Sequence, residues 1–363
     1  MIKVLTVVGA RPQFIKAAAI SHVIKEKYSH LIVEDILHTG QHYDDNMSGQ
    51  FFTELDIPQP KYNLGVGSAS HGAQTAAMLK GIEDIILSNH YDGMLVYGDT
   101  NSTLAGALAA SKQQLPVYHV EAGLRSFNRN MPEEINRIVT DHLSTLLFAP
   151  TEKAMQNLRN EGFPEENIIL SGDVMLDNIL RYTSFAVQNS QFSFFNSKFI
   201  LATLHRDFNT DHPERLTNIL SALNSVGHAF NTEILLPLHP RTRQHIDSMT
   251  SKPDMTYIRT TAPLSYLQTL AALRQTRLVL TDSGGLQKEA YFCGKPCVIL
   301  RPETEWTEIV DAGAAILADD NPQTILDAAK KLWDTTPPPA AVFGDGHAAE
   351  KIIENFFKVS RKL

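Results

Sequence analysis

The chain has 363 residues, of which 43% are hydrophobic and 20% are charged. This balance excludes intrinsic disorder for the bulk of the chain, and the length predicts two domains. The net charge of −8 argues against sequence-independent binding to nucleic acid or to an anionic membrane, so we expect neither partner.

The only two cysteines are Cys293 and Cys297, and their spacing matches neither a redox motif nor a zinc site. So few thiols predict a reducing compartment without a disulfide framework. Residues 1–5 lead directly into a strand-like run and lack the features of a signal peptide, and no apolar run is long enough to span a membrane. We therefore expect a cytoplasmic protein.

Short apolar runs in the first half each end in a polar loop that is followed by a helix-like stretch. The runs at 4–8, 94–97 and 117–120 are followed by Gly9, by Gly98 with Asp99, and by Glu121. Strands that alternate with helices indicate βαβ units and a parallel sheet.

The second half repeats this pattern with runs at 199–203, 234–236 and 278–280. The sequence therefore predicts an α/β fold with two Rossmann-like, doubly wound domains that face a cleft, because ligands bind at the carboxyl ends of parallel strands. Residues 184–198 show no clear period and are predicted to contain the hinge. The expected parts are a first domain at 1–180, a second at 181–345, and a C-terminal helix at 346–363 that packs back on the first.

The most informative segment is TDSGGLQKEA, at residues 281–290. A strand ends there, Ser283 precedes a helix, and Gly284 and Gly285 allow a ligand close to the backbone. Exposed N–H groups at a helix N-terminus favour a diphosphate, and Glu289 could accept hydrogen bonds from sugar hydroxyls. The alternative is an ordinary strand–turn–helix connection with a capping serine.

Two cations begin the first predicted helix. Pro12 suits a first helical turn, and Arg11 and Lys16 then lie near a helix N-terminus, where positive charge is disfavoured. This placement indicates an anionic ligand, although two solvated cations remain the alternative. The dinucleotide fingerprint G-x-G-x-x-G is absent here.

Three carboxylic acids of the first domain form a candidate acid/base set. Asp99 and Glu121 end neighbouring strands, and Glu133 follows a proline at a helix start. Carboxyl groups that converge in one cleft can divide acid and base roles between them. In the second domain, His205 and His239 end two strands, where they could neutralise a diphosphate.

Taken together, these motifs resemble one known family, the non-hydrolysing UDP-N-acetylglucosamine 2-epimerases, from about residue 4 to residue 313. Each motif is weakly specific, but their joint order is highly specific. The motifs are GARPQFIK at 9–16, TGQH at 39–42, GDTNST at 98–103, HVEAGLR at 119–125, MPEEINR at 131–137, APTE at 149–152, HR at 205–206 and TDSGGLQKEA at 281–290.

The resemblance implies the glycosyltransferase-B architecture, a homodimer, a UDP-amino sugar as substrate, and neither a metal nor a nicotinamide cofactor. It also implies a role for each matching residue. The implied catalytic residues are Asp99, Glu121, Glu133, Lys16 and His205; the implied UDP-binding residues are Arg11, His205, Ser283, Gly284, Gly285 and Glu289; and further substrate contacts are Arg125, His239, Arg301 and Glu305.

The implied reaction explains why such residues are needed. The proton at C2 of the sugar is not adjacent to a carbonyl, so direct deprotonation is prohibitively difficult. Departure of UDP from C1 gives that carbon oxocarbenium character and acidifies the C2 proton. A carboxylate removes the proton to give a 2-acetamidoglucal, and a second carboxyl group returns one to the opposite face as UDP adds back.

One segment and two single residues depart from the family pattern. Residues 43–45 read YDD where members activated by their own substrate tend to carry Arg and Glu, which puts such activation in doubt. Trp306 replaces the arginine of a T-E-R-P-E pattern and resembles the branch that acts on UDP-2,3-diacetamido-2,3-dideoxyglucuronate; neutral change at a cleft rim is the alternative. Lys288 replaces a common acidic residue, and we expect it on the surface.

Other functions remain open from sequence alone. A glycosyltransferase of the same architecture would need an acceptor site and no paired carboxyl groups. A hydrolysing epimerase would release free sugar and UDP. An inactive nucleotide-sugar sensor would not need Asp99, Glu121, Glu133 and Arg11 together.

Overall fold

The structure is a computed structural model that describes residues 1–40, 52, 54–188, 199–249 and 251–360. The chain forms two compact units, Met1–Asn178 with Ala341–Leu363, and Ile179–Ala340. The YDD segment at 43–45 and most of the expected hinge lie outside the described residues.

Unit 1 contains a parallel sheet in the order β3-β2-β1-β4-β5-β6-β7. Its central strands are entirely buried, because helices cover both faces of the sheet. The strands are β1 (Ile2–Val8), β2 (Ile32–His38), β3 (Tyr62–Asn63), β4 (Gly93–Tyr97), β5 (Val117–Val120), β6 (Leu146–Ala149) and β7 (Ile168–Leu170).

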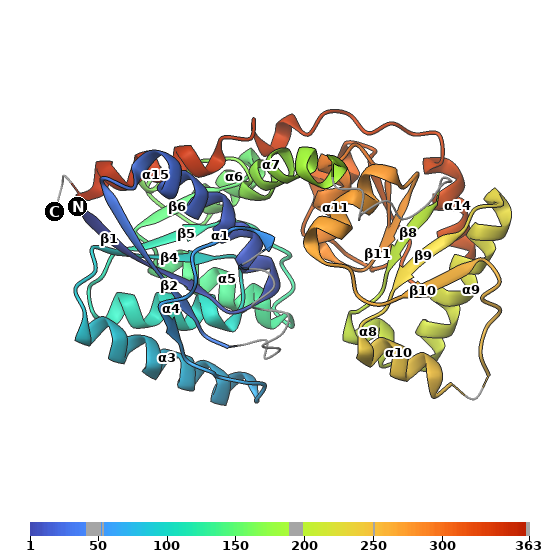
Figure 1. The fold of residues 1–363 in the computed structure, drawn as a ribbon, viewed down its shortest axis with the longest axis horizontal. Helices are drawn as coiled ribbons and strands as arrows, with labels where there is room; N and C mark the ends of the chain where they lie inside the picture. The colour runs from blue at the N-terminus through green and yellow to red at the C-terminus, as the bar shows by residue number, and fades with distance from the viewer. Residues whose placement is uncertain (41–51, 53, 189–198, 250, 361–363) are drawn as a thin grey trace. The chain divides into compact units, whose positions relative to one another are not determined.

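The helices of unit 1 form two layers. Figure 1 shows α3 and α4 on one side of the sheet and α15 and α6 on the other. The helices are α1 (Arg11–Val23), α3 (His71–Ser88), α4 (Asn101–Lys112), α5 (Pro132–Leu143), α6 (Glu152–Asn160) and α15 (Ala348–Ser360), with the short helical segments η1 (Ile24–Tyr28), η2 (Glu165–Asn167) and η4 (Ala341–Phe343). Helix α7 (Val174–Gln188) begins in unit 1 and continues into unit 2.

The last helix, α15, belongs to unit 1 and packs against α1. Its apolar stripe is buried: the ring of Phe356 stacks on Tyr118 of β5 with a centroid distance of 4.5 Å. Asp177 on α7 fixes its N-terminus by accepting hydrogen bonds from the N–H groups of Ala348 (3.1 Å) and Ala349 (2.8 Å). Helix packing and capping therefore hold α15 on this unit.

Asp177 should make stability depend on pH. Burial raises its pKa to about 6, although the two N–H groups favour its ionised form. Because folding raises this pKa, the carboxyl stabilises unit 1 most below about pH 4, and on the order of 2 kcal/mol is lost as the pH rises through 6. In Asp177→Asn, this part of the decline in unfolding free energy should be lost from pH-dependent denaturant titrations, whereas the part due to Glu34 of unit 1, whose pKa burial also raises, should remain.

A neighbouring acid provides the control. Lys351 lowers the pKa of the exposed Asp345, so Asp345→Asn should retain the decline between pH 4 and 7. Parallel pH profiles for the wild type and Asp177→Asn would contradict the prediction.

Unit 2 contains a second parallel sheet in the order β10-β9-β8-β11-β12-β13. The strands are β8 (Ile200–Thr203), β9 (Ile234–Pro237), β10 (Ile258–Thr261), β11 (Val279–Thr281), β12 (Cys297–Ile299) and β13 (Ala315–Leu317). The helices are α8 (Asp207–Thr210), α9 (Pro213–Phe230), α10 (Pro240–Asp247), α11 (Tyr266–Gln275), α12 (Gly284–Phe292), α13 (Thr307–Asp311) and α14 (Pro322–Leu332).

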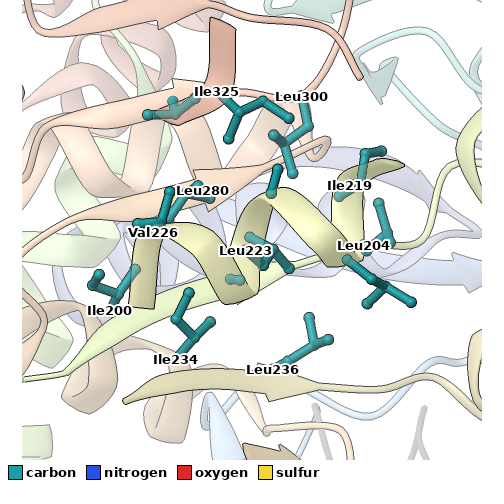
Figure 2. Close-up of a cluster of buried hydrophobic side chains, with 14 of the residues drawn as sticks. Ile200, Leu204, Ile219, Leu223, Val226, Ile234, Leu236, Leu280, Leu300 and Ile325 are labelled. Carbon is teal, nitrogen blue, oxygen red and sulfur yellow. The ribbon is translucent and has the colours of Figure 1, made fainter. Parts of the chain in front are cut away.

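The core of unit 2 lies between its sheet and the helices α9 and α14. Figure 2 shows Leu223 and Val226 of α9 among side chains of the sheet, including Ile200 of β8 and Ile234 of β9. All four are completely buried, and each such side chain contributes roughly 2 kcal/mol through removal of apolar surface from water. The two parallel sheets confirm the predicted α/β class with two Rossmann-like domains.

Each sheet reverses its strand order at one point, between β1 and β4 in unit 1 and between β8 and β11 in unit 2. Loops diverge at the carboxyl ends of such strands and leave a crevice for ligands. The predicted site residues Arg11, Asp99, His205 and Ser283 all follow these four strands. None of the described helices is both long and apolar enough to cross a membrane.

Candidate active site

In unit 1, the turn after β1 is held by one buried glutamine. The side-chain oxygen of Gln13 accepts from the N–H groups of Gly9 (2.8 Å) and Ala10 (3.1 Å), and its Nε2 donates to the carbonyl of Tyr97 (3.0 Å) and to the hydroxyl of Thr103 (2.9 Å). It therefore ties the start of α1 to the end of β4 and the start of α4. The sequence prediction did not include this residue.

The next turn of α1 carries Lys16, which is 8% exposed and forms a buried ion pair with Glu121. The pair lies directly over Gly98: a Cβ atom there would be 3.0 Å from the Lys16 ammonium and 3.2 Å from a Glu121 oxygen. Gly98 also has φ of +63°, which favours glycine. The structure thus brings two of the predicted residues together at the end of β4.

Glu121 itself has a left-handed backbone, with φ of +71°. A non-glycine residue in this region costs on the order of 1–3 kcal/mol and is found mainly at functional sites. The N–H group of Glu121 donates to the carbonyl of Phe148 (3.1 Å), and its carboxylate meets Lys16. The local fold therefore holds this carboxylate in one orientation.

Asp99 has a different cation, Arg137 of α5. Arg137 bridges Asp99 and Glu134, and its NH1 group is 2.6 Å from the Glu134 carboxylate. Glu134 is buried and also accepts from the N–H groups of Ser126 and Phe127 at 3.0 Å each. A fixed guanidinium therefore orients Asp99, whose side chain is 31% exposed.

Glu133 is the second residue of α5 and is half-buried. It is adjacent in sequence to Glu134, so its backbone lies beside the Arg137 network. Its acid/base role remains a prediction. Arg11, the first residue of α1, is also half-buried, and no acidic residue occupies the first turn of that helix.

In unit 2, His205 and Asp282 meet at the ends of the adjacent strands β8 and β11. Nδ1 of His205 lies 3.0 Å from Oδ1 of Asp282. Burial alone would raise the pKa of Asp282, but His205 and the N–H groups of His205 and Arg206 hold it below its ordinary value. This anionic, fully buried carboxylate orients the imidazole of His205, whose side chain is 46% exposed.

Asp282→Asn should weaken binding of a diphosphate. The amide removes the negative charge beside His205 and offers a donor where Nδ1 needs an acceptor. We expect the Kd for UDP in calorimetry to rise about tenfold, the size of one charge-assisted hydrogen bond.

Thr203→Val is the matched control, because it removes a nearby half-buried hydrogen bond, between the hydroxyls of Thr203 and Thr281 at 2.5 Å, without changing a partner of His205. An unchanged UDP affinity in Asp282→Asn, or an equal loss in Thr203→Val, would refute the prediction.

Ser283 caps α12 by accepting from the N–H group of Leu286 at 3.4 Å. Beside it, a Cβ atom at Gly284 would lie 2.3 Å from the Glu305 carboxylate, so only glycine fits; at Gly285 the nearest atom would be 4.0 Å away. Glu305 is in turn fixed by Arg301, at 3.0 Å. The predicted residues Ser283, Gly284, Arg301 and Glu305 are thus one cluster.

Two further predicted residues lie on neighbouring elements. Glu289 is on α12, one turn beyond Gly285, and is 6% exposed. His239 follows β9 and is exposed, and its Nδ1 accepts from the N–H group of Arg241 at 3.4 Å as the cap of α10. Their ligand-binding roles remain predictions.

The structure gives Arg125 another role than the expected substrate contact. Its side chain is 1% exposed and forms ion pairs with Asp141 (2.7 Å) and Glu161 (2.6 Å). Its guanidinium therefore fixes α5 and α6 inside unit 1. Its expected substrate contact stays a prediction.

The expectation of a surface position for Lys288 is wrong. Lys288 is 1% exposed, and its ammonium lies 3.8 Å from the centre of the Trp306 ring. Trp306 is itself only 4% exposed, rather than at a rim. The two departures from the family pattern are therefore one contact, a buried cation–π pair beside the Gly284 loop.

Among the described residues, no cluster of three or more His, Cys, Asp or Glu side chains is arranged to hold a metal ion. The side chains at the strand ends are two carboxylates, each with its own cation, in unit 1 and a histidine–aspartate pair beside the loop capped by Ser283 in unit 2.

The family model described as UDP-N-acetylglucosamine 2-epimerase matches residues 26–356. The chain belongs to this family. It is accordingly an epimerase, an isomerase acting on a nucleotide sugar. A curated relative from Pseudomonas aeruginosa, named UDP-2,3-diacetamido-2,3-dideoxy-D-glucuronate 2-epimerase, is 48% identical over 98% of this chain and 100% of its own length. A UDP-N-acetylglucosamine 2-epimerase from Methanocaldococcus jannaschii is 42% identical over 97% of this chain and 98% of its own length.

Solved structures of this epimerase family share the fold. The crystal structure of the M. jannaschii UDP-GlcNAc 2-epimerase in complex with UDP-GlcNAc and UDP has a TM-score of 0.90 and 40% identity, covering 98% of this chain and 100% of that one. The Neisseria meningitidis enzyme bound to UDP-GlcNAc gives 0.88 and 32%, with coverage of 98% and 100%. The epimerase thus has the glycosyltransferase-B type of fold, with two Rossmann-like domains.

Proposed function

We propose that this epimerase interconverts UDP-N-acetylglucosamine and UDP-N-acetylmannosamine, or a closely related pair of UDP-2-acetamido sugars, without hydrolysis. The observation that carries the proposal is the pairing of Glu121 with Lys16 and of Asp99 with Arg137, at the ends of adjacent strands. Two carboxylates with separate cations can serve as acid and base on one substrate.

The first step is departure of UDP, which breaks the C1–O bond and leaves the electron pair on the diphosphate. Arg11, His205 and the N–H groups after Ser283 are suited to stabilise this charge, because a cation and a helix N-terminus both favour phosphate oxygens. Glu289 is proposed to bind the ribose hydroxyls, and Arg301 and Glu305 to shape the loop at Gly284.

The second step is loss of the C2 proton to one carboxylate of the set Asp99, Glu121 and Glu133. This gives the 2-acetamidoglucal, in which the C–H electrons form the C1–C2 double bond. The reaction then reverses with a proton delivered by another carboxyl group to the opposite face, while the UDP oxygen re-forms the bond to C1. No atom or electron is gained or lost overall, and each step as written uses only the substrate and carboxyl groups of the chain.

A second substrate is favoured by one specific observation. Trp306 and Lys288 form a cation–π pair next to Glu305. Trp306 takes the place of the arginine in the common T-E-R-P-E pattern of the family. The P. aeruginosa relative, at 48% identity, is named for UDP-2,3-diacetamido-2,3-dideoxyglucuronate. We keep this sugar as the alternative substrate.

Proton NMR in D₂O with UDP-N-acetylglucosamine and no added metal tests the proposal. We expect signals of UDP-N-acetylmannosamine with deuterium at C2. Free UDP with free N-acetylmannosamine would instead indicate hydrolysis. Binding of UDP without any exchange would overturn the first substrate, and the same measurement with the diacetamido-glucuronate sugar would then decide between the alternative and a transferase or sensor.

We also infer a homodimer in the cytoplasm. An apolar groove of about 460 Å³ between α3, α4 and α5, with Leu79, Leu104 and Ile135 in its lining, supports association of two copies. The free thiols of Cys293 and Cys297 fit a reducing compartment. Light scattering coupled to size exclusion should give twice the chain mass, and a single-chain mass would refute the dimer.

A further inference from the structure

A buried histidine–aspartate contact links the two loops that carry Asp99 and Glu121. His119 lies on β5 and Asp141 on α5, and both side chains are 0% exposed. Nδ1 of His119 is 2.7 Å from Oδ1 of Asp141. The sequence assigned no chemistry to either residue, and neither takes part in the reaction steps proposed above.

Both ring nitrogens of His119 face acceptors. Nδ1 meets the Asp141 carboxylate, and Nε2 is 2.8 Å from the backbone oxygen of Gly98. Neither acceptor can donate, so a ring that satisfies both carries a proton on each nitrogen and is a cation. The charged groups in contact alternate in sign, because Asp141 also pairs with Arg125 and Arg125 with Glu161.

Each end of the pair holds a different loop. The Gly98 carbonyl belongs to the peptide group that leads into Asp99. The other oxygen of Asp141 accepts from the N–H group of Gly123 at 3.2 Å, two residues after Glu121. Gly98 and Gly123 have positive φ, which glycine adopts readily, but Glu121 has positive φ as a non-glycine residue, so its turn depends on fixed contacts.

We propose that His119 and Asp141 are positioning residues for the epimerisation, with His119 held as an imidazolium that fixes the backbone of Asp99 and Glu121. This inference rests on the proposed function, because it concerns the two carboxylates assigned to proton transfer. Neither residue touches the substrate in this assignment. Displacing a reacting group by about 1 Å can reduce the rate about 10²-fold, so loss of the pair should affect turnover far more than UDP binding.

The protonation state can be measured without any activity. In ¹⁵N-labelled protein at pH 8, NMR correlation of the imidazole nitrogens should show both nitrogens of His119 protonated. The signals are assigned by their loss in His119→Gln. One unprotonated ring nitrogen would overturn the proposal.

The positioning role is tested with Asp141→Asn. We expect C2 proton exchange to fall about 10²-fold while the Kd for UDP changes less than twofold. Glu161→Gln is the matched control, since Glu161 ends the same chain of ion pairs but bonds to the backbone of neither Gly98 nor Gly123, so it should retain exchange within about threefold.

Equal losses of exchange in Asp141→Asn and Glu161→Gln, or parallel losses of exchange and UDP affinity in Asp141→Asn, would overturn the positioning role. If Asp141→Asn does not fold, His119→Gln, which keeps a donor for one acceptor, replaces it in the same comparison. A wild type that exchanges no C2 proton would refute the proposed function, whereas the NMR measurement would still report on the imidazolium.

Discussion

Replacing Glu121 with glutamine should reduce C2 proton exchange by about 10³-fold or more while UDP still binds with nearly wild-type affinity. An amide cannot take up the proton, and general acid/base groups contribute about 10²–10⁴-fold. The amide oxygen can still accept from Lys16, so the buried ammonium keeps a partner. Asp99→Asn and Glu133→Gln should show the same separation of turnover from binding in D₂O NMR and calorimetry.

The control is Asp84→Asn, an exposed carboxylate on α3 that pairs with Lys80 at 2.6 Å. It should change neither exchange nor affinity. Full activity in all three amide variants would refute the acid/base assignment. Full activity in only one would remove that carboxyl group from the set.

Trp306→Ala should destabilise unit 2 by about 3–5 kcal/mol, the usual range for removal of a buried tryptophan. The ring also lies against the Lys288 ammonium, so its loss exposes a buried cation to a cavity. Trp306→Arg should be at least as damaging, because it places two cations together. Thermal and denaturant unfolding measure both effects.

A double variant with a new opposite-charge pair at positions 288 and 306 tests whether the two residues stabilise unit 2 by interacting with each other or only by filling space. Lys288→Glu in the Trp306→Arg background restores an opposite-charge contact, so the double variant should be more stable than either single variant. The control is Leu270→Ala, which creates a cavity at a fully buried residue of α11 outside this pair. Its loss of unfolding free energy and that of Lys288→Glu should be additive in the double variant. Additive losses from Lys288→Glu and Trp306→Arg would contradict the coupling.

The architecture could be predicted because its signal is local. Each buried strand of a parallel sheet is a short apolar run, and the polar residues that follow mark its carboxyl end. Asp99, Glu121 and Ser283 were found this way. Strand order then brings Asp99 near Glu121, because β4 pairs with β5, and Ser283 near His205, because β8 pairs with β11.

The partners of these residues could not be predicted, because they come from distant parts of the chain. Arg137 reaches Asp99 across 38 positions, and His205 reaches Asp282 across 77. The charge of a side chain also did not predict whether it is exposed or buried. Lys288 was expected in solvent, yet a tryptophan 18 positions later accommodates it, and only the contact itself reveals that the two departures belong together.

The return of α15 to unit 1 has a consequence for the order of synthesis. Unit 2, Ile179–Ala340, is a continuous segment that is synthesised in full before α15. Unit 1 begins first but must wait for Phe356 to cover Tyr118, so its apolar surface there stays open while its neighbour folds. The N-terminal half of this enzyme is therefore the last to be completed, and a premature stop after residue 340 would harm the unit that was translated first.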